Sequence, residues 1–173
     1  MNLKIVEDLA NRLIKEKFTI KISTTNQNTL SAHDLGYTFK FDHAKRRAGC
    51  CNYTDKTISL SKVIVLHNID RMDSIEDTIR HEIAHALSHG LFGKRGANHG
   101  NYWKMVARTI GASPTRCYND KKFAPVDSKY TLRCNNCGTT SSRHKMVKKS
   151  FACASCCRNG YDSRYKLEVI KNW

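Results

Sequence analysis

The chain has 173 residues, 40% of them apolar, with a formal net charge of +15 and a sequence pI of about 9.6. This length suits one globular domain with a small added module, and no stretch approaches the roughly 20 consecutive apolar residues that span a bilayer. We therefore expect no membrane span. The charge favours a polyanionic partner, for which we expect nucleic acid.

The N-terminal residues 1–18 distribute acids and bases among apolar residues, so they lack the apolar centre of a secretory signal peptide. We expect an intracellular monomer, cytoplasmic or nucleoid-associated, or nuclear if the source is eukaryotic. In such a compartment the eight cysteines are better explained as metal-binding thiolates than as disulfides.

The first third of the chain predicts a helix followed by strands. Residues 3–18 carry apolar residues at helical spacing with charges between them, which indicates an amphipathic helix. Residues 36–42 alternate aromatic and polar side chains, as a half-buried strand does. After a basic turn, residues 50–61 read as a hairpin with its turn near Asp55 and Lys56.

A central helix is predicted to begin near Asp73 or Ser74, because two overlapping capping-box patterns, "DSIE" and "SIED", start there. It should end at Gly90, a residue suited to the position after a helix. A loop over 91–98 then leads to a second helix near 100–110, and residues 123–128 read as a linker.

Two faces of the central helix carry different residues. One face presents an apolar stripe at i, i+4 spacing that should point into the core, formed by Ile75, Ile79, Ile83 and Leu87. At about 100° per residue, His81 and His85 fall on roughly the opposite face. These two histidines are therefore better candidates for ligands in a cleft than for core residues.

The segment His81-Glu82-x-x-His85 matches the HExxH pattern of zinc hydrolases. Histidines four residues apart on a helix can hold one ion from the same side. Glu82 lies one step round, where it can act as the base that activates a zinc-bound water. We predict a catalytic zinc site with Glu82 as the catalytic residue.

A catalytic zinc usually has three protein ligands, so one more is needed. His89 continues the spacing, but a straight helix cannot bring three residues at i, i+4 and i+8 to one ion. Between Glu82 and Asp120 the chain has no acid that could serve. The prediction for the third ligand is His99, reached through a loop that contains Gly93 and Gly96, with His89 as the alternative.

The acid-free segment 83–119 contains five basic residues, namely Lys94, Arg95, Lys104, Arg108 and Arg116. The predicted metal cleft is therefore flanked by uncompensated positive charge. Its substrate, or whatever holds that substrate, is expected to be anionic.

A second metal site is predicted from two Cys-x2-Cys pairs separated by fifteen residues. This spacing is typical of a zinc ribbon, in which four thiolates close a tetrahedral structural site. The predicted ligands are Cys134, Cys137, Cys153 and Cys156, while Cys157 could replace Cys156 by a one-residue slip.

Residues 127–173 hold ten Lys and Arg against three Asp and Glu, with aromatic residues between them. Cations beside aromatic rings favour contacts to the backbone and bases of single-stranded DNA. Over the whole chain, the candidate nucleic-acid contacts are Lys94, Arg95, Arg143, Lys145, Lys148, Lys149, Phe151 and Arg158.

The segments "GYTFKFDHAKRRAGCCNY", "KTISLS", "IRHEIAHAL" and "NHGNYWK", followed by four cysteines, resemble the SprT-like metalloproteases, which include bacterial SprT and eukaryotic Spartan. The resemblance implies an α+β, zincin-like domain over 1–124, with helices packed on a small antiparallel sheet, and a zinc-ribbon module over 125–173. It implies His81, His85 and His99 as ligands and Glu82 as base. Spartan-like members cleave proteins crosslinked to DNA.

Two functions remain open from the sequence. The first is a zinc endopeptidase that acts on DNA-bound or DNA-crosslinked protein, with one catalytic and one structural zinc. The alternative is a non-enzymatic DNA-binding or regulatory protein with two structural zincs, which needs a fourth protein ligand at the first site, for which His89 is the local candidate.

Overall fold

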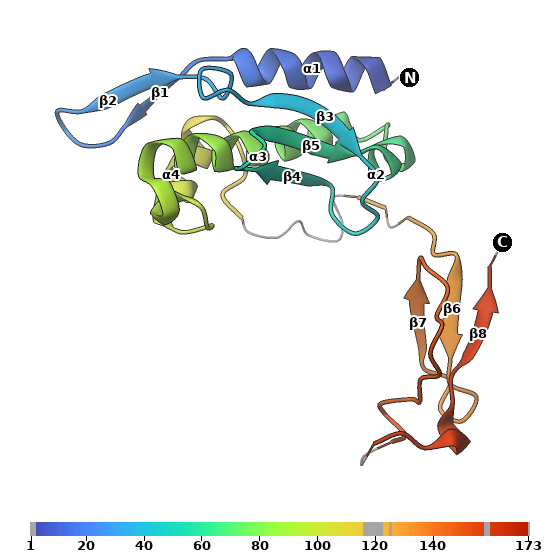
Figure 1. Cartoon of the computed structure of the whole chain (residues 1–173). Helices are drawn as coiled ribbons and strands as arrows, with labels where there is room; N and C mark the ends of the chain where they lie inside the picture. The colour runs from blue at the N-terminus through green and yellow to red at the C-terminus, as the bar shows by residue number, and fades with distance from the viewer. Residues whose placement is uncertain (1–2, 116–122, 125, 158–159, 173) are drawn as a thin grey trace. The chain divides into compact units, whose positions relative to one another are not determined.

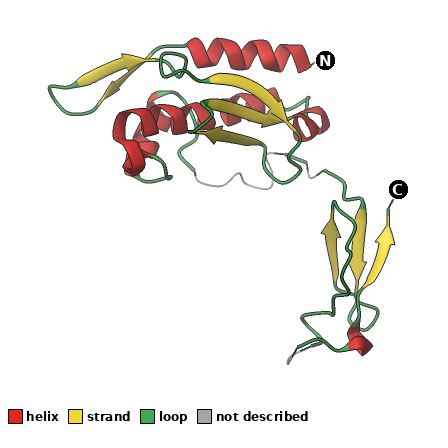
Figure 2. Ribbon diagram, viewed as in Figure 1, coloured by secondary structure: helices red, strands yellow, loops and turns green. Residues whose placement is uncertain are grey.

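The chain folds into two compact units, Met1–Pro125 and Val126–Trp173. The structure is a computed structural model, and it describes residues 3–115, 123–124, 126–157 and 160–172. Each unit combines strands with helical segments (Figure 1, Figure 2), and the first unit is an α+β fold, as expected from the sequence. Within the described residues, no helix is both long enough and apolar enough to cross a membrane.

The first unit contains four α-helices, one 3-10 helix and five strands within the described residues. Their order is α1 Leu3–Lys15, β1 Phe18–Lys21, β2 Gln27–Leu30, β3 Thr38–Asp42, β4 Gly49–Asn52, β5 Thr57–Ser61, α2 Lys62–His67, α3 Met72–Phe92, η1 Gly93–Gly96 and α4 Asn101–Thr109.

The main sheet is mixed, with strand order β3-β5-β4, so the prediction of an antiparallel sheet was wrong. The β4–β5 hairpin is antiparallel as predicted, and its turn contains Lys56 at a φ of 50°. However, β3 pairs with β5 in parallel. The connection over 43–48 crosses the end of β5, where the Ser61 N–H donates to the Ala48 carbonyl and the Ser61 hydroxyl to the Ala44 carbonyl. It therefore carries the chain from one edge of the sheet to the other.

Asp42 holds the start of this crossing connection. Its carboxylate accepts hydrogen bonds from the Ala44 N–H and the Ser59 hydroxyl, both at 2.9 Å. The Arg47 guanidinium lies 2.9 Å from the same carboxylate. The connection is thus a structured loop rather than the simple basic turn read from the sequence.

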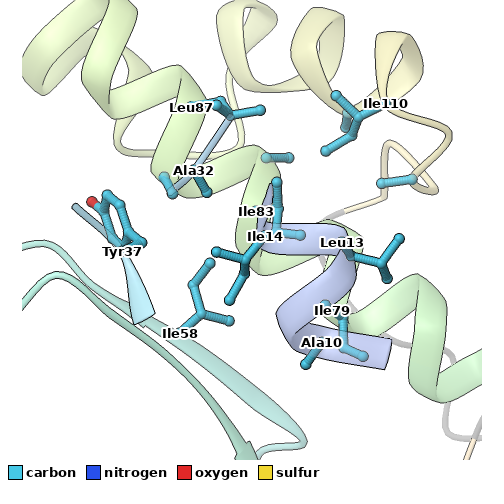
Figure 3. Close-up of a cluster of buried hydrophobic side chains, with 14 of the residues drawn as sticks. Ala10, Leu13, Ile14, Ala32, Tyr37, Ile58, Ile79, Ile83, Leu87 and Ile110 are labelled. Atoms are coloured by element: carbon cyan, nitrogen blue, oxygen red, sulfur yellow. The ribbon is translucent and has the colours of Figure 1, made fainter. Parts of the chain in front are cut away.

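The hydrophobic core lies between α1, α3 and the main sheet. The stripe formed by Ile75, Ile79, Ile83 and Leu87 is fully buried, which confirms the predicted core face of α3. Figure 3 shows side chains of α1, α3 and β5 meeting in one cluster, including Ala10, Leu13, Ile14, Ile58, Ile79, Ile83 and Leu87.

The ends of α3 differ from the prediction. The helix begins at Met72, and Arg71 at its N-cap makes no side-chain capping bond, so neither predicted capping box forms. Asp77 instead accepts a hydrogen bond from the Ser113 N–H at 2.8 Å. The helix also continues past Gly90 to Phe92, and Gly93, with a φ of 56°, follows it.

Gly90 is a packing glycine inside the helix. A Cβ atom at residue 90 would lie 2.5 Å from Leu35 Cδ1, so its missing side chain makes room for the loop before β3. Glycine at residue 90 therefore serves close packing, and the helix does not end there.

The second unit is built around a three-stranded antiparallel sheet. Its strands are β6 Tyr130–Arg133, β7 Thr140–Arg143 and β8 Glu168–Lys171, in the order β7-β6-β8, and a short 3-10 helix, η2, covers Ser163–Tyr165. At the end of the first unit, buried Asn68 donates a hydrogen bond to the Ala124 carbonyl at 3.1 Å. Residue 124 is thereby fixed to the first unit, inside the segment predicted as a linker.

Candidate metal centres

Three histidines of the first unit converge on one point. His81 and His85 lie on α3, one turn apart, and His99 lies just before α4. The Nε2 atom of His99 is 3.0 Å from the Nε2 atoms of both His81 and His85. The structure thus brings together the three residues that the sequence singled out, and their ligand atoms all lie within 4.8 Å of one another.

The loop that delivers His99 is pressed tightly against α3. A Cβ atom at Gly96 would lie 2.1 Å from the backbone oxygen of Ser88, so only glycine fits there. Gly93 begins the turn in a left-handed conformation, with a φ of 56°. These two glycines let η1 fold back along the helix and place His99 beside His81 and His85.

The histidine cluster is sheltered from solvent. His81 and His85 are only 6% and 8% exposed, although they lie away from the core stripe. The fully buried indole of Trp103 lies against all three rings, with centroid distances of 4.7 Å to His81, 5.2 Å to His85 and 4.5 Å to His99. The predicted cleft face of α3 is therefore covered by the residue 99–103 segment.

Glu82 follows His81 on α3, and its side chain is largely buried. It is 6% exposed, and burial raises the pKa of its carboxyl group to about 8, opposed by a hydrogen bond from the Cys51 backbone N–H and by the charge of Arg47. A Cβ atom at Gly49 would lie 2.7 Å from Glu82 Oε1. The absence of a side chain at Gly49, the first residue of β4, therefore leaves room for the Glu82 carboxyl group in its present position.

Tyr53 contacts His85, a contact that the sequence analysis missed. Its hydroxyl lies 3.3 Å from His85 Nδ1 and donates a hydrogen bond to the Ala97 carbonyl at 3.0 Å. Burial, followed by the charges of His81 and His99, lowers the pKa of His85 to about 3, so this ring is neutral at physiological pH. A neutral imidazole is the form that binds metal.

His89 lies outside the group of three. Its ring stacks on the Tyr53 ring, with centroids 4.2 Å apart and an interplanar angle of 15°. Within the described residues, the metal-competent group of the first unit consists of His81, His85 and His99, without His89. The fourth protein ligand that a purely structural site would need is therefore not supplied by His89.

Four cysteines of the second unit form another group. The Sγ atoms of Cys134, Cys137, Cys153 and Cys156 all lie within 4.8 Å of one another, whereas Cys157 is not part of the group. Hydrogen bonds to the side chain and then the backbone of Thr139 lower the pKa of Cys137 to about 6, which favours its thiolate form.

The donor sets fit zinc at both places. Zinc binds imidazole nitrogen at about 2.0–2.1 Å, and tetrahedral ligands at that range lie about 3.3 Å apart, close to the observed 3.0 Å separations. Three neutral nitrogens with an acid nearby suit a catalytic site, whereas four thiolates suit a closed structural site. The structure is thus compatible with one site of each kind.

Most of the proposed nucleic-acid contacts lie on exposed surface. Lys94 and Arg95 are exposed on η1, and the Arg95 guanidinium lies 5.8 Å from the Tyr102 ring centroid. In the second unit, the exposed candidates are Arg143, Lys145, Lys148, Lys149 and Phe151. Arg158, like Arg116 of the acid-free segment, lies outside the described residues.

A groove in the second unit joins charge to apolar surface. It is lined by Lys148, Lys149, Phe151 and Lys166, together with Leu132 and Val169. The Phe151 side chain is 49% exposed, so its ring is accessible to a partner. An exposed ring among lysines is typical of surfaces that bind single-stranded nucleic acid.

Comparison with known proteins places these features in a family. The model of the SprT-like family matches residues 14–123, which include the three histidines and Glu82. Proteins named Protein SprT are similar to this chain: that of Pseudomonas putida (strain W619) is 32% identical over 98 residues, covering 53% of this chain and 60% of that protein. That of Pseudomonas entomophila (strain L48) is 28% identical over 118 residues, covering 64% and 71%. No solved structure was found to match the chain.

Proposed function

Because the chain belongs to the SprT-like family, we propose that it is a zinc-dependent endopeptidase that acts on DNA-bound or DNA-crosslinked proteins. The observation that carries the proposal is the convergence of His81, His85 and His99, together with the buried carboxyl group of Glu82 on the helix that carries two of them. The family supports this activity, while the residues of this chain suggest how it operates.

The three imidazoles would hold the zinc ion, which when bound acts as a Lewis acid on water and on the peptide carbonyl. Glu82 is the group that moves the proton. One of its carboxylate oxygens takes a proton from the attacking water and later delivers it to the departing amine nitrogen. Gly49 leaves room for the Oε1 atom of this carboxyl group.

The surrounding residues limit water and hold the ligands. Trp103 packs against all three rings and shields them from solvent on that side. A dry site strengthens the electrostatic interactions on which peptide hydrolysis depends. The four-cysteine group would hold the second zinc, which stabilises a unit too small for a large core.

The charge of both units supports DNA as the partner that presents the substrate. The histidine site is followed by an acid-free, basic stretch, and the second unit carries a groove with three lysines and Phe151. A protein held on single-stranded or partly single-stranded DNA would therefore be concentrated near the protease. Binding of this kind weakens steeply with salt.

The test compares the wild type with Glu82→Gln, using a basic DNA-binding protein as substrate. Each is incubated without DNA, with single-stranded DNA and with double-stranded DNA, and zinc content is measured in parallel. The wild type should cleave substrate, and itself, when single-stranded DNA is present, whereas Glu82→Gln should keep its zinc and lose cleavage by at least about 100-fold. Equal cleavage by both proteins would refute the mechanism.

A further inference from the structure

We propose that Tyr53 is a positioning residue that fixes which nitrogen of His85 faces the metal, and that His89 holds Tyr53 in place by stacking. This inference rests on the histidine metal site proposed above. It gives a role to the third histidine of the "HEIAHALSH" segment, which is not needed as a ligand.

Counting protons at the Tyr53 hydroxyl gives the direction of each hydrogen bond. The hydroxyl has one proton, and it is donated to the Ala97 carbonyl at 3.0 Å. Toward His85 the same oxygen can only accept, so Nδ1 of His85 must carry the proton. The lone pair is then on Nε2, the atom that lies 3.0 Å from His99 Nε2. The hydrogen bond thus selects the tautomer that can bind metal with Nε2.

The same hydroxyl also connects two parts of the site. His85 is carried by α3, whereas Ala97 lies two residues before His99 in the loop after η1. Tyr53 itself follows β4, the strand whose first residue, Gly49, packs on Glu82. One side chain therefore sets the orientation of one ligand relative to the loop that carries another.

His89 restricts the position of the Tyr53 ring. The two rings are nearly parallel, 15° apart, with their centroids at 4.2 Å. His89 lies one helical turn beyond His85, so α3 supplies both the ligand and the support of the residue that orients it. Such stacking depends on a flat ring and not on an imidazole nitrogen.

This distinction gives a matched pair of variants. His89→Phe keeps a flat ring against Tyr53, while His89→Ala removes it. Tyr53→Phe removes the hydroxyl and keeps the stack. Tyr37→Phe is the control, because it removes a buried tyrosine hydroxyl that makes no hydrogen bond to a histidine. All are made in Glu82→Gln, so that self-cleavage does not interfere.

The zinc affinity of the histidine site is measured by competition with a chelator. The fraction of histidine sites that hold zinc is read from the ¹⁵N resonances of His85, because zinc at the cysteine site does not change them. Tyr53→Phe should bind zinc roughly 10- to 100-fold more weakly. His89→Ala should lose roughly two- to tenfold, from the loss of one ring stack, whereas His89→Phe and Tyr37→Phe should match the parent. In the zinc-bound parent, the His85 Nδ1 proton should be protected from exchange with solvent, and Tyr53→Phe should lose that protection.

Unchanged affinity and unchanged proton exchange in Tyr53→Phe would overturn the inference and leave the proposed function intact. If His89→Phe loses zinc as severely as His89→Ala, His89 is a ligand and the stacking role is wrong. If the parent binds no zinc through His85, the proposed function fails, and the inference fails with it.

Discussion

Gly49 on β4 and Glu82 on α3 are in direct contact: a Cβ atom on residue 49 would lie 2.7 Å from Glu82 Oε1 and 2.9 Å from Cγ of the same side chain. An edge strand of the sheet and the central helix are thus fitted to each other at the carboxyl group proposed to be catalytic. The contact shows how a residue with no reactive group can control the position of one that has.

Gly49→Ala is expected to reduce cleavage while leaving zinc bound. The added methyl group would be too close both to Glu82 Oε1, at 2.7 Å, and to Thr78 Cγ2, at 2.9 Å. The flexible Glu82 side chain would therefore have to move away. A displacement of about 1 Å in a catalytic group can reduce the rate about 100-fold, and we expect a loss of at least tenfold in kcat/KM. Steady-state kinetics and zinc content provide the measurement. Full activity would show that the carboxyl group tolerates the displacement.

Gly96→Ala should empty the histidine site selectively. The new methyl group would collide with the Ser88 backbone oxygen, which cannot move without deforming α3, so the loop carrying His99 has to shift. The zinc content is expected to fall from two ions per chain to one, with the cysteine site retained. Because the blocking atom belongs to the backbone, adding Ser88→Ala should not restore the lost ion. Retention of two ions by Gly96→Ala would contradict the prediction.

In the zinc-free protein, the contribution of Glu82 to the stability of the first unit should decrease between pH 6.5 and pH 8. Burial raises the pKa of Glu82 from an ordinary value of 4.5 to about 8, so above pH 4.5 the folded protein keeps a proton that the unfolded chain releases, and stability declines until about pH 8. His85 acts oppositely but only below pH 6.5, because its pKa falls from 6.5 to about 3. The slope above pH 6.5 is at most about 1.4 kcal/mol per pH unit.

Urea unfolding of the chelator-treated protein at several pH values measures this slope. Glu82→Gln serves as the control, since it has no carboxyl group at this position, and the difference between the two proteins isolates the Glu82 contribution between pH 6.5 and pH 8. An equal slope in both proteins would assign the effect to other groups.

Cys156→Ala and Cys157→Ala form a matched pair in the second unit. Only Cys156 belongs to the four-sulfur group. We expect Cys156→Ala to lose one zinc and to unfold residues 126–172, because metal binding stabilises so small a unit. Cys157→Ala should keep two zincs and its folded spectrum. Metal analysis and two-dimensional NMR distinguish the two, and the opposite result would establish the one-residue slip.

Phe151→Ala and Lys148→Gln should weaken single-stranded DNA binding in different ways. Loss of the exposed ring should cost about 1–3 kcal/mol, the value of one stacked base, without changing the salt dependence. Loss of the lysine should reduce the slope of log affinity against log salt by about 0.7. Titrations by fluorescence anisotropy at several salt concentrations test both. Unaltered binding by both variants would remove this groove from the DNA-binding surface.

The parts of the site that the sequence could predict are those encoded by local spacing. His81, Glu82 and His85 lie within five residues of one helix, so helical geometry alone groups them. His99 was reached by excluding other ligands, and the structure brings it to the same point. Tyr53 could not be found this way, because its contact with His85 joins residues 32 positions apart and depends on how β4 packs against α3.

Local sequence patterns predicted the ends of α3 wrongly where the same residues make tertiary contacts instead. The capping boxes at Asp73 and Ser74 did not form, because the helix already begins at Met72. The acids of the two boxes make other contacts: Glu76 accepts hydrogen bonds from Arg80, and Asp77 accepts one from the Ser113 N–H. Gly90 appeared to end the helix but instead accommodates Leu35. The direction of β3 was beyond any local pattern, because alternation of side chains is the same in parallel and antiparallel pairs.

The mixed order of the main sheet has a consequence for how the first unit folds. In the β4–β5 hairpin, Asn52 pairs with Thr57, only five residues away, whereas every β3–β5 pair joins residues nineteen apart. Closing the longer loop costs more chain entropy before any contact is gained, so the hairpin should form first and β3 should dock later. The strand that carries Gly49 would then form early, and α3 with its Glu82 carboxyl group would pack against it afterwards.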